Sequence, residues 1–483
     1  MTNRLRLTLL GAALLLGTAQ ALPSTTLPEA ALDRVPAARV VRPGATVPGT
    51  PPELNTSITV RYGPARPRAV LLLMPGFLGG AGSLDRLARQ LVVLDPGLAV
   101  WAVDRRANAL EPQAQIAAAD PAGLRRIVQE GLPVRPPESL GFLRDWGLDL
   151  TLRDWRTAVL EARALTPDVF LGGHSLGGVL AGLYAAYDFG GTPGWRDLRG
   201  LVLLDGVPGQ AAFQPLTRSQ YEGGYFNSSV PVRAPGLNAL ARQPYVDTFF
   251  FGPTLASRAA AQARLAGLDP GGLAPVGGLT RYPATHLAAG LGQLEGRYSL
   301  LPFLAVRTGQ ATNARTLPNP LPRLLGAPQS SEFILGPADP ARPVGWQADP
   351  QAPTDPLDFA RRYWTPLADY AEWYFPQRLT LDVNAANLGT RGTSFEQELR
   401  VWHGAEVPLP LLGIAAEGGL TRPDDYARYA ATTLGTATTH SLPGAAHLDI
   451  TAARSDAVAR WILTWLGEVT RPPSAAPPAK PPP

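Results

Sequence analysis

Short, wholly apolar runs that alternate with helical patterns constrain the fold of this chain more than any other feature. The apolar runs are residues 69–74, 99–103, 169–172 and 200–204. Apolar residues recur at helical spacing in residues 83–94, 151–165 and 178–187. Strands that are apolar on both faces belong to parallel sheets, which the connecting helices cover. We therefore expect an α/β fold, with a mostly parallel sheet and helices on both faces.

The alternation stops after residue 206 and resumes near residue 407. Residues 207–406 are rich in proline and in aromatic clusters, such as the one at 373–375. Three patterns follow: an apolar run at 409–415, helical spacing near 424–433 and at 452–468, and a short strand near 439–442. The simplest organisation is one sheet core, formed by residues 57–206 and 407–469, that carries residues 207–406 as a large cap or lid insertion.

The N-terminus has the three parts of a secretory signal peptide. Arg4 and Arg6 precede an apolar run at residues 7–16, and Ala19-Gln20-Ala21 supplies a small-x-small cleavage site. We therefore expect residues 1–21 to be removed and the protein to be secreted or periplasmic. No other stretch is long enough to cross a bilayer, so no integral membrane segment is expected in the mature chain.

The remaining ends read as unstructured. Residues 22–56 are rich in Pro, Ala and Thr with little periodicity, which predicts a flexible N-terminal segment. Residues 470–483 are dominated by proline and predict a disordered tail.

Composition excludes several classes of function. Charged residues make up 17% of the chain, the formal net charge is +4, and no dense Lys/Arg cluster occurs, so no nucleic-acid partner is expected. No His, Asp or Glu group has metal-ligand spacing and no phosphate loop is evident, so we expect neither a metal nor a cofactor. Cysteine is absent, which excludes disulfides. Asp104, Arg105 and Arg106, which follow the run at 99–103, are expected to be structural.

The pentapeptide Gly173-His174-Ser175-Leu176-Gly177 fits the pattern G-x-S-x-G. It follows the apolar run at 169–172 and opens a helical pattern, which is the strand-turn-helix setting of a nucleophile elbow. The helix N-terminus would direct backbone amides at a developing oxyanion. Ser175 is therefore the candidate nucleophile, with a purely structural glycine-rich turn as the alternative.

A serine nucleophile needs a base, and the chain contains five histidines. His174 would point away from the nucleophile, and His440 lies inside a short strand. His286 and His403 lie within or at the end of the insertion, where structural roles are expected. His447 lies in a loop of small residues between the last strand and the last helix, where a base could meet Ser175. His447 is therefore the candidate general base.

Three segments resemble the oxyanion loop, elbow and histidine loop of the α/β-hydrolase superfamily. They are residues 74–80 (MPGFLGG), 172–178 (GGHSLGG) and 444–449 (GAAHLD). The resemblance covers about residues 69–206 and 408–469, and it implies a lipase-like or esterase-like serine hydrolase. It also implies that the oxyanion donors are the backbone N–H groups of Phe77 and Leu176.

The acid of the triad is left open. Family members usually place it after the strand expected at 409–415, where this chain has Glu417 followed by two glycines. The rival is Asp205, directly after the run at 200–204, a position that some lipases of this fold use. Asp424 and Asp425 lie further along.

The expected activity is hydrolysis of small-molecule or lipid carboxylic esters through an acyl-enzyme, with apolar groups bound under the aromatic insertion. Peptidase, thioesterase or acyltransferase chemistry would use the same triad. A non-catalytic binding protein on the same fold is the alternative from another class. The sequence leaves the oligomeric state open.

Overall fold

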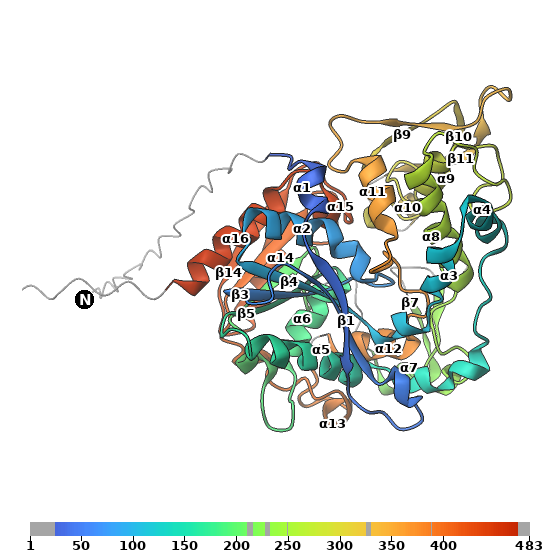
Figure 1. Ribbon diagram of the computed structural model, residues 1–483. Coiled ribbons are helices and arrows are strands. Elements are labelled where there is room, and N and C mark those ends of the chain that lie inside the picture. Colours follow the sequence, from blue (N-terminus) through green and yellow to red (C-terminus); the bar gives the residue numbers. More distant parts are fainter. Residues whose placement is uncertain are drawn as a thin grey trace, which may run out of the picture.

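The computed structural model describes residues 25–209, 216–227, 232–248, 250–324, 330–387 and 389–471. The predicted signal peptide and nearly all of the predicted tail lie outside these ranges. Eight strands form one sheet in the order β1-β2-β4-β3-β5-β6-β13-β14 (Figure 1). They are β1 (Ala37–Pro43), β2 (Thr56–Tyr62), β3 (Ala69–Met74), β4 (Leu98–Asp104), β5 (Val169–His174), β6 (Gly200–Leu204), β13 (Leu411–Ala416) and β14 (Ala437–Leu442).

All pairs from β4 to β14 are parallel, and only β2 pairs antiparallel with its neighbours β1 and β4. The helices on the sheet are α2 (Asp85–Leu94), α5 (Leu148–Arg163), α6 (Leu176–Ala186), α14 (Pro423–Ala431), α15 (Asp449–Ala452) and α16 (Ala457–Thr470). The prediction of a mostly parallel sheet with helices is confirmed.

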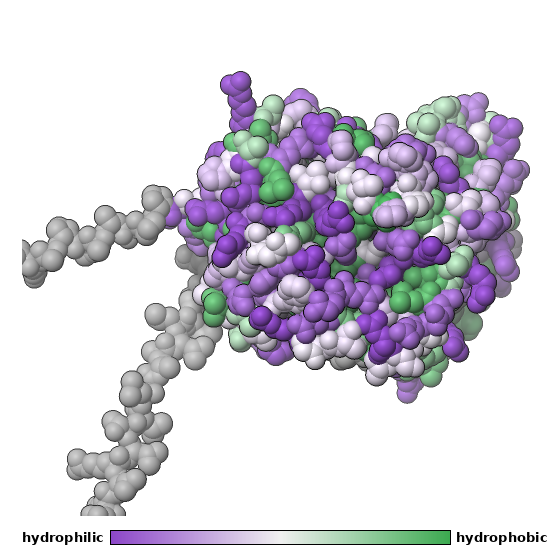
Figure 2. Space-filling model, turned by 90° about the horizontal axis from the view of Figure 1, so that it is seen from below, coloured by the Kyte–Doolittle hydropathy of each residue, from purple (hydrophilic) through white to green (hydrophobic). Residues whose placement is uncertain are grey.

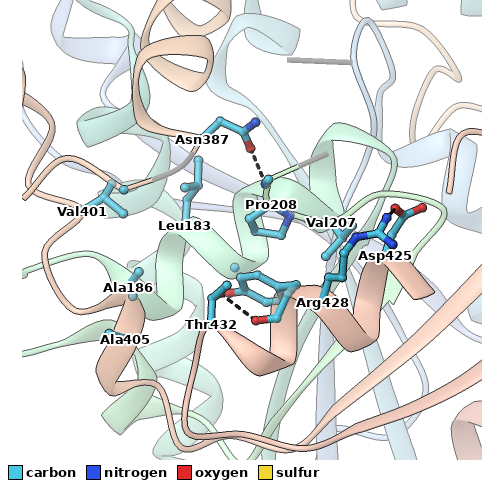
Figure 3. Close-up of a pocket in the computed structure, with 15 residues that line it drawn as sticks. Leu183, Ala186, Val207, Pro208, Asn387, Val401, Ala405, Asp425, Arg428 and Thr432 are labelled. Atoms are coloured by element: carbon cyan, nitrogen blue, oxygen red, sulfur yellow. Dashed lines mark hydrogen bonds and ion pairs between the residues drawn. The ribbon is translucent and has the colours of Figure 1, made fainter. Parts of the chain in front are cut away.

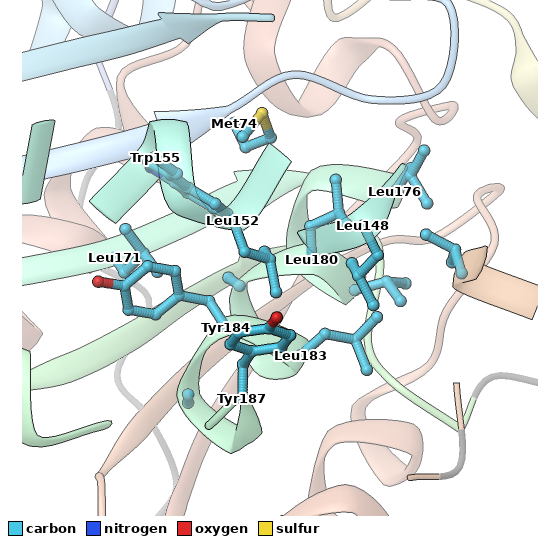
Figure 4. Packing of buried hydrophobic residues seen from close by; sticks show 14 of the residues in the cluster. Met74, Leu148, Leu152, Trp155, Leu171, Leu176, Leu180, Leu183, Tyr184 and Tyr187 are labelled. Atoms are coloured by element: carbon cyan, nitrogen blue, oxygen red, sulfur yellow. The ribbon is translucent and has the colours of Figure 1, made fainter. Parts of the chain in front are cut away.

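Alternate side chains of β3 enter two different cores, as the two-residue period of a strand requires. Leu72 packs with α5 and α6, in the core where Met74, Leu152 and Leu180 meet (Figure 4). Leu73 packs in the other core, with residues of α2 and α16. Both faces of the sheet are therefore buried, which explains the continuous apolar runs in the sequence.

The prediction that residues 22–56 form a flexible segment is wrong from residue 25 onward. This stretch contains α1 (Glu29–Asp33) and the edge strand β1, which pairs with β2 along its whole length. The backbone N–H and the hydroxyl of Thr25 both donate to the Asp456 carboxylate, at 2.8 Å each. Strand β1 lacks a clear apolar pattern because an edge strand is only partly buried and carries arginines.

Residues 207–406 contribute no strand to the eight-stranded sheet within the ranges described. Their helices are α7 (Arg218–Gly223), α8 (Pro253–Leu268), α9 (His286–Leu291), α10 (Leu321–Leu324), α11 (Pro356–Tyr363), α12 (Gln377–Ala386) and α13 (Glu396–Leu399). Their strands form three small antiparallel pairs: β7 (Tyr225–Asn227) with β8 (Val232–Ala234), β9 (Gly309–Thr312) with β12 (Gly345–Ala348), and β10 (Ala314–Asn319) with β11 (Ser331–Pro337).

The segment between β4 and α5 packs with this insertion, although the sequence assigned it to the sheet core. It contains α3 (Gln113–Ala118) and α4 (Pro121–Glu130), which lie beside α8 in Figure 1. Leu124 of α4 and Ala260 of α8 belong to one buried cluster. Some residues before position 206 therefore pack with the insertion as well. Apolar spacing predicts that a helix has a buried face, but not which part of the chain covers that face.

The last helix, predicted over residues 452–468, begins later, at the start of α16, and the separate short helix α15 precedes it. Ala453 leaves the helical conformation, with φ −58° and ψ 139°. Across the described residues, no helix is both long and apolar enough to span a membrane. On the face shown in Figure 2, apolar side chains form separate patches among polar ones.

Candidate active site

Ser175 occupies the sharp turn between β5 and α6, with φ 57° and ψ −124°. Side chains other than glycine rarely adopt a positive φ, and the strain indicates a functional constraint. The Ser175 N–H donates to the Leu204 carbonyl of β6 at 2.8 Å, which fixes the turn to the edge of the sheet. This geometry is that of a nucleophile elbow.

The glycines around Ser175 are required by close backbone approach. A Cβ at Gly177 would lie 2.0 Å from the carbonyl oxygen of Met74. A Cβ at Gly206 would lie 1.9 Å from the carbonyl oxygen of Ser175. The ends of β3 and β6 thus press against the turn from its two sides, and only glycine fits there.

His447 and Asp205 meet beside this turn. Nδ1 of His447 lies 2.6 Å from Oδ2 of Asp205, and the two residues are 3% and 0% exposed. His447 lies in the loop between β14 and α15, and Asp205 directly follows β6 with φ 45°. The pair orients the imidazole so that its other nitrogen, Nε2, is left for chemistry.

The Asp205 carboxylate accepts several further hydrogen bonds. The N–H and hydroxyl of Thr421 donate to Oδ1 at 3.0 and 2.7 Å, and the N–H of Leu420 donates to Oδ2 at 3.0 Å. Burial alone would raise the pKa of Asp205, but the hydrogen bond and charge of His447, together with these donors, lower it to about 2. The carboxylate is therefore ionised at neutral pH.

The other candidate acids lie elsewhere. Glu417 is exposed and accepts from the N–H of Gly444 at 2.6 Å. Asp425 accepts from the N–H of Arg422 at 2.6 Å at the start of α14, and Asp424 lies in the same helical turn. A Cβ at Gly419 would lie 2.0 Å from Oδ2 of Asp205. Of the two acids left open by the sequence, the structure brings Asp205 to His447, and Gly419 makes the room.

His174 contacts His447 directly, a contact that its position in the motif does not reveal. Their ring centroids are 4.4 Å apart, and Nε2 of His174 lies 3.0 Å from the His447 carbonyl oxygen. Burial, followed by the charge of His447, lowers the pKa of His174 to about 3, so it is neutral and donates this hydrogen bond. His174 thereby links the elbow to the histidine loop.

No hydrogen bond joins Ser175 Oγ to His447 in the part of the chain that the structure describes. Ser175 is partly exposed, and the ring of His447 lies against the ring of His174, the residue directly before the serine, with an angle of 35° between the two rings. In ligand-free sites such hydrogen bonds are often long and tighten only with substrate.

Phe77 and Leu176 supply backbone N–H groups next to Ser175. Leu176 begins α6, so its N–H has no acceptor within the helix. Phe77 lies in the turn after β3, where a Cβ at Gly76 would be 3.0 Å from Cβ and 3.5 Å from Oγ of Ser175. Within the described ranges, no loop or side-chain hydrogen bond takes up either N–H.

The remaining histidines lie outside the site. Nδ1 of His286 contacts the Asp269 carbonyl oxygen at 2.8 Å, and His403 lies between Asp188 and Glu406. His440 stacks on Trp461 with ring centroids 4.7 Å apart. Among the described residues, no group of three or more His, Asp or Glu side chains could hold a metal ion.

A cavity of about 420 Å³ lies along the far part of α6 (Figure 3). Leu183 and Ala186 of α6, Pro208, Asn387 and Arg428 of α14 contribute to its walls. Ser175, Asp205 and His447 do not line it. This cavity is therefore separate from the site at the start of α6.

The parallel sheet, the strained serine after β5 and the His447–Asp205 pair define an α/β-hydrolase fold. The chain order is serine, aspartate, histidine, and the Phe77 N–H lies in the loop after β3, an arrangement that is typical of this fold.

No protein-family model and no curated protein matches this sequence. Solved structures similar to the chain include a candidate lipase from Sulfolobus solfataricus, with 15% identity and a TM-score of 0.45 over 90% of this chain and 95% of the other. A laboratory-evolved variant of potato epoxide hydrolase has 16% identity and a TM-score of 0.40, covering 89% and 99%. An esterase from Thermogutta terrifontis has 13% identity and a TM-score of 0.34, covering 90% and 99%. Because these TM-scores are low, the fold assignment rests on strand order and site geometry.

Proposed function

We propose that the protein is a serine hydrolase that cleaves carboxylic esters through an acyl-enzyme. Ser175 is the nucleophile, His447 the general base and Asp205 the acid that orients it. The observation that carries this proposal is the 2.6 Å contact between His447 Nδ1 and Asp205 Oδ2, buried beside a serine in a strained elbow.

In the acylation step, Oγ of Ser175 attacks the ester carbonyl carbon while Nε2 of His447 takes the hydroxyl proton. The negative charge on the carbonyl oxygen is bound by the N–H groups of Phe77 and Leu176. Asp205 stabilises the imidazolium that forms. The tetrahedral intermediate then expels the alcohol, which receives the proton from His447.

Deacylation repeats these steps with water. His447 takes a proton from the water that attacks the acyl carbonyl, the same two N–H groups bind the oxyanion, and Ser175 leaves with the proton returned by His447. The products are a carboxylic acid and the free enzyme.

The substrate proposed has an apolar acyl or alcohol group. Phe77 is 43% exposed although its own N–H is one of the two donors, and its ring packs edge-on against Phe375 at 4.9 Å between centroids. An exposed aromatic ring beside the oxyanion position favours contact with hydrocarbon. This supports an esterase or lipase over a peptidase or an acyltransferase for polar groups.

The test is a panel of p-nitrophenyl esters of graded acyl length, combined with a fluorophosphonate probe that reacts only with an activated serine. We expect hydrolysis of several esters and a label on the peptide that contains Ser175. Ser175→Ala should fold normally and lower kcat by roughly 10⁴–10⁶.

Two outcomes would contradict the proposal in different ways. Absence of labelling would favour a non-catalytic binding protein. Labelling without ester hydrolysis would favour thioesters or peptides as substrates. Epoxide hydrolase or dehalogenase chemistry would need a carboxylate nucleophile at position 175, where this chain has serine.

We also propose export with cleavage after Ala21, which rests on the sequence pattern. Thr25, held by Asp456, would then follow the new N-terminus at Leu22 closely. The intact mass of secreted protein checks this.

A further inference from the structure

Arg105 is a buried arginine whose donors are directed at the turn that carries Phe77. It follows β4 directly and is 6% exposed. Nη1 donates to the Pro75 carbonyl oxygen at 3.1 Å. Nη2 donates to the carbonyl oxygens of Gly76 at 3.0 Å and Gly79 at 2.6 Å. One guanidinium therefore holds three carbonyls of a single turn, a geometry that its planar fork suits and a lysine cannot reproduce.

One of these carbonyls belongs to the peptide that joins Gly76 to Phe77. The N–H of that peptide is the Phe77 donor. In a planar trans peptide the C=O and the N–H point in opposite directions. A guanidinium on the oxygen side therefore fixes the direction of the N–H on the other side, where the turn lies against Ser175.

The same contact also strengthens the donor. A charged donor on the carbonyl oxygen polarises the peptide, so that its N–H becomes a better hydrogen-bond donor. The effect is large where water is excluded, and both Arg105 and Gly76 are buried.

Glu372 of the insertion holds Arg105 and the turn from the other side. Its Oε2 accepts from Nε of Arg105 at 2.5 Å, and its backbone N–H donates to the Leu78 carbonyl oxygen at 2.9 Å. Burial, opposed by Arg105, raises the pKa of Glu372 to about 7. The turn is thus clamped between the core and the insertion.

We infer that Arg105 is a positioning residue that orients and polarises the Phe77 N–H for binding of the oxyanion. The inference rests on the proposed function, because it assigns the strength of one oxyanion donor to a side chain that does not touch substrate. Arg105 should therefore contribute to kcat and little to KM.

The turn itself offers a variant that keeps the backbone shape and removes the donor. The Gly79 N–H donates to the Gly76 carbonyl oxygen at 3.2 Å, and Leu78 has φ 59°, so Phe77 and Leu78 form the centre of a type II turn. Proline is favoured at the first central position of such a turn. Phe77→Pro should keep the turn and delete both the N–H and the ring. Phe77→Ala deletes the ring alone, so the comparison of the two variants isolates the N–H.

The experiment is a double-mutant cycle on p-nitrophenyl butyrate with Phe77→Pro and Arg105→Lys. Phe77→Pro should lower kcat by roughly 10²–10³ relative to Phe77→Ala. Arg105→Lys should lower kcat by at least about 10-fold, with KM changed by less than about threefold. In the Phe77→Pro background, Arg105→Lys should cost less than about threefold, since the group it acts through is gone.

Arg106→Lys is the matched control. Arg106 is 4% exposed and donates two hydrogen bonds to Asp154, and its other hydrogen bonds go to Asn55 and Ala45, outside the turn. Its kcat should stay within about threefold of the wild type. If Arg105→Lys does not fold, Glu372→Gln replaces it in the same cycle as a milder release of the same clamp, with a smaller loss of kcat expected that again disappears in the Phe77→Pro background.

Equal losses in both backgrounds, or no loss in either, would overturn the inference. Failure of the proposed function is distinguishable, since the wild-type protein would then not hydrolyse the ester, whereas failure of the inference leaves a wild-type protein that hydrolyses it.

Discussion

Asp205 and Glu372 are both fully buried carboxylates, each paired with a basic side chain, on the two sides of Ser175. Asp205 follows β6 and holds His447, whereas Glu372 holds Arg105 at the turn after β3. Their pKa values nevertheless move in opposite directions, to about 2 for Asp205 and to about 7 for Glu372.

The difference lies in how many donors each carboxylate receives. Asp205 accepts from His447, from both donors of Thr421 and from the N–H groups of Leu420 and Ala416. Glu372 accepts from Arg105 at Oε2, and Oε1 has no partner among the described residues. Burial penalises both charges. At Asp205 the hydrogen bond and charge of His447, together with the further donors, outweigh burial, whereas at Glu372 the charge of Asp104 adds to the rise that Arg105 opposes. On the acid side, formed by Asp205 and His447, the carboxylate is therefore ionised at neutral pH. On the oxyanion side, formed by Glu372, Arg105 and the turn after β3, the carboxylate titrates near neutral pH.

The role of the Asp205 carboxylate can be tested by removing its negative charge. Asp205→Asn keeps the size of the side chain but loses the carboxylate that fixes the His447 tautomer and stabilises the imidazolium. We expect kcat to fall by roughly 10³–10⁴. Steady-state kinetics on the best ester of the panel would measure this.

Glu417→Gln is the matched control, because Glu417 was the other acid compatible with the sequence. It bonds Gly444 at the exposed edge of the loop, so kcat should change by less than about threefold. If kcat falls strongly in Glu417→Gln and stays near the wild-type value in Asp205→Asn, the triad acid is Glu417, after the later strand.

The sheet could be anticipated because its central strands are buried on both faces. The apolar runs predicted for β3, β4 and β6 match the observed strands closely. The edge strand β1 could not be anticipated, since Arg39 and Arg42 interrupt its pattern and the pairing uses only backbone groups. Helices α3 and α4 each have an apolar face, but the sequence does not indicate that the insertion covers it.

Within the site, the sequence predicted those features that are formed by consecutive residues. The turn around Ser175 is made by five consecutive residues, so a pentapeptide identifies it. The choice between Asp205 and Glu417 depends on how two strand ends approach each other, and Gly419, two residues after Glu417, is the local signal for it. The contacts of Arg105 with carbonyls of the turn after β3 leave no trace in the sequence, because any residue supplies a carbonyl.

Geometry alone can also break the acid side. In Gly419→Ala the added Cβ would lie 2.0 Å from Oδ2 of Asp205, so the carboxylate must move while its charge remains. A displacement of about 1 Å in a catalytic group can cost about 10²-fold in rate, and we expect a loss of kcat of that order.

Gly418→Ala provides the comparison for this variant. Its added Cβ approaches nothing closer than the Ala445 carbonyl oxygen at 3.2 Å, so kcat should stay near that of the wild type. Equal kcat values for the two alanine variants would mean that the Asp205 carboxylate tolerates displacement.

The oxyanion side is tested by pH, with the smallest expected effect. Glu372 has an ordinary pKa of 4.5 and a pKa of about 7 in the folded chain. A carboxyl whose pKa is raised by folding stabilises the fold fully below its unfolded pKa and loses that contribution as the pH rises through the folded value. Between about pH 4.5 and about pH 8, wild-type protein should therefore lose about 3 kcal/mol of unfolding free energy that Glu372→Gln retains.

Urea unfolding of both proteins across this range measures the difference between their unfolding free energies. The contributions of other groups that titrate in this range cancel in that difference. Asp205 supplies the contrast. Its lowered pKa stabilises the fold above its ordinary value of 3.8 and is lost only as the pH falls toward about 2. Parallel curves of unfolding free energy against pH for wild type and Glu372→Gln would show that Glu372 keeps one ionisation state throughout. The carboxylates of Glu372 and Asp205 would then not differ in their titration.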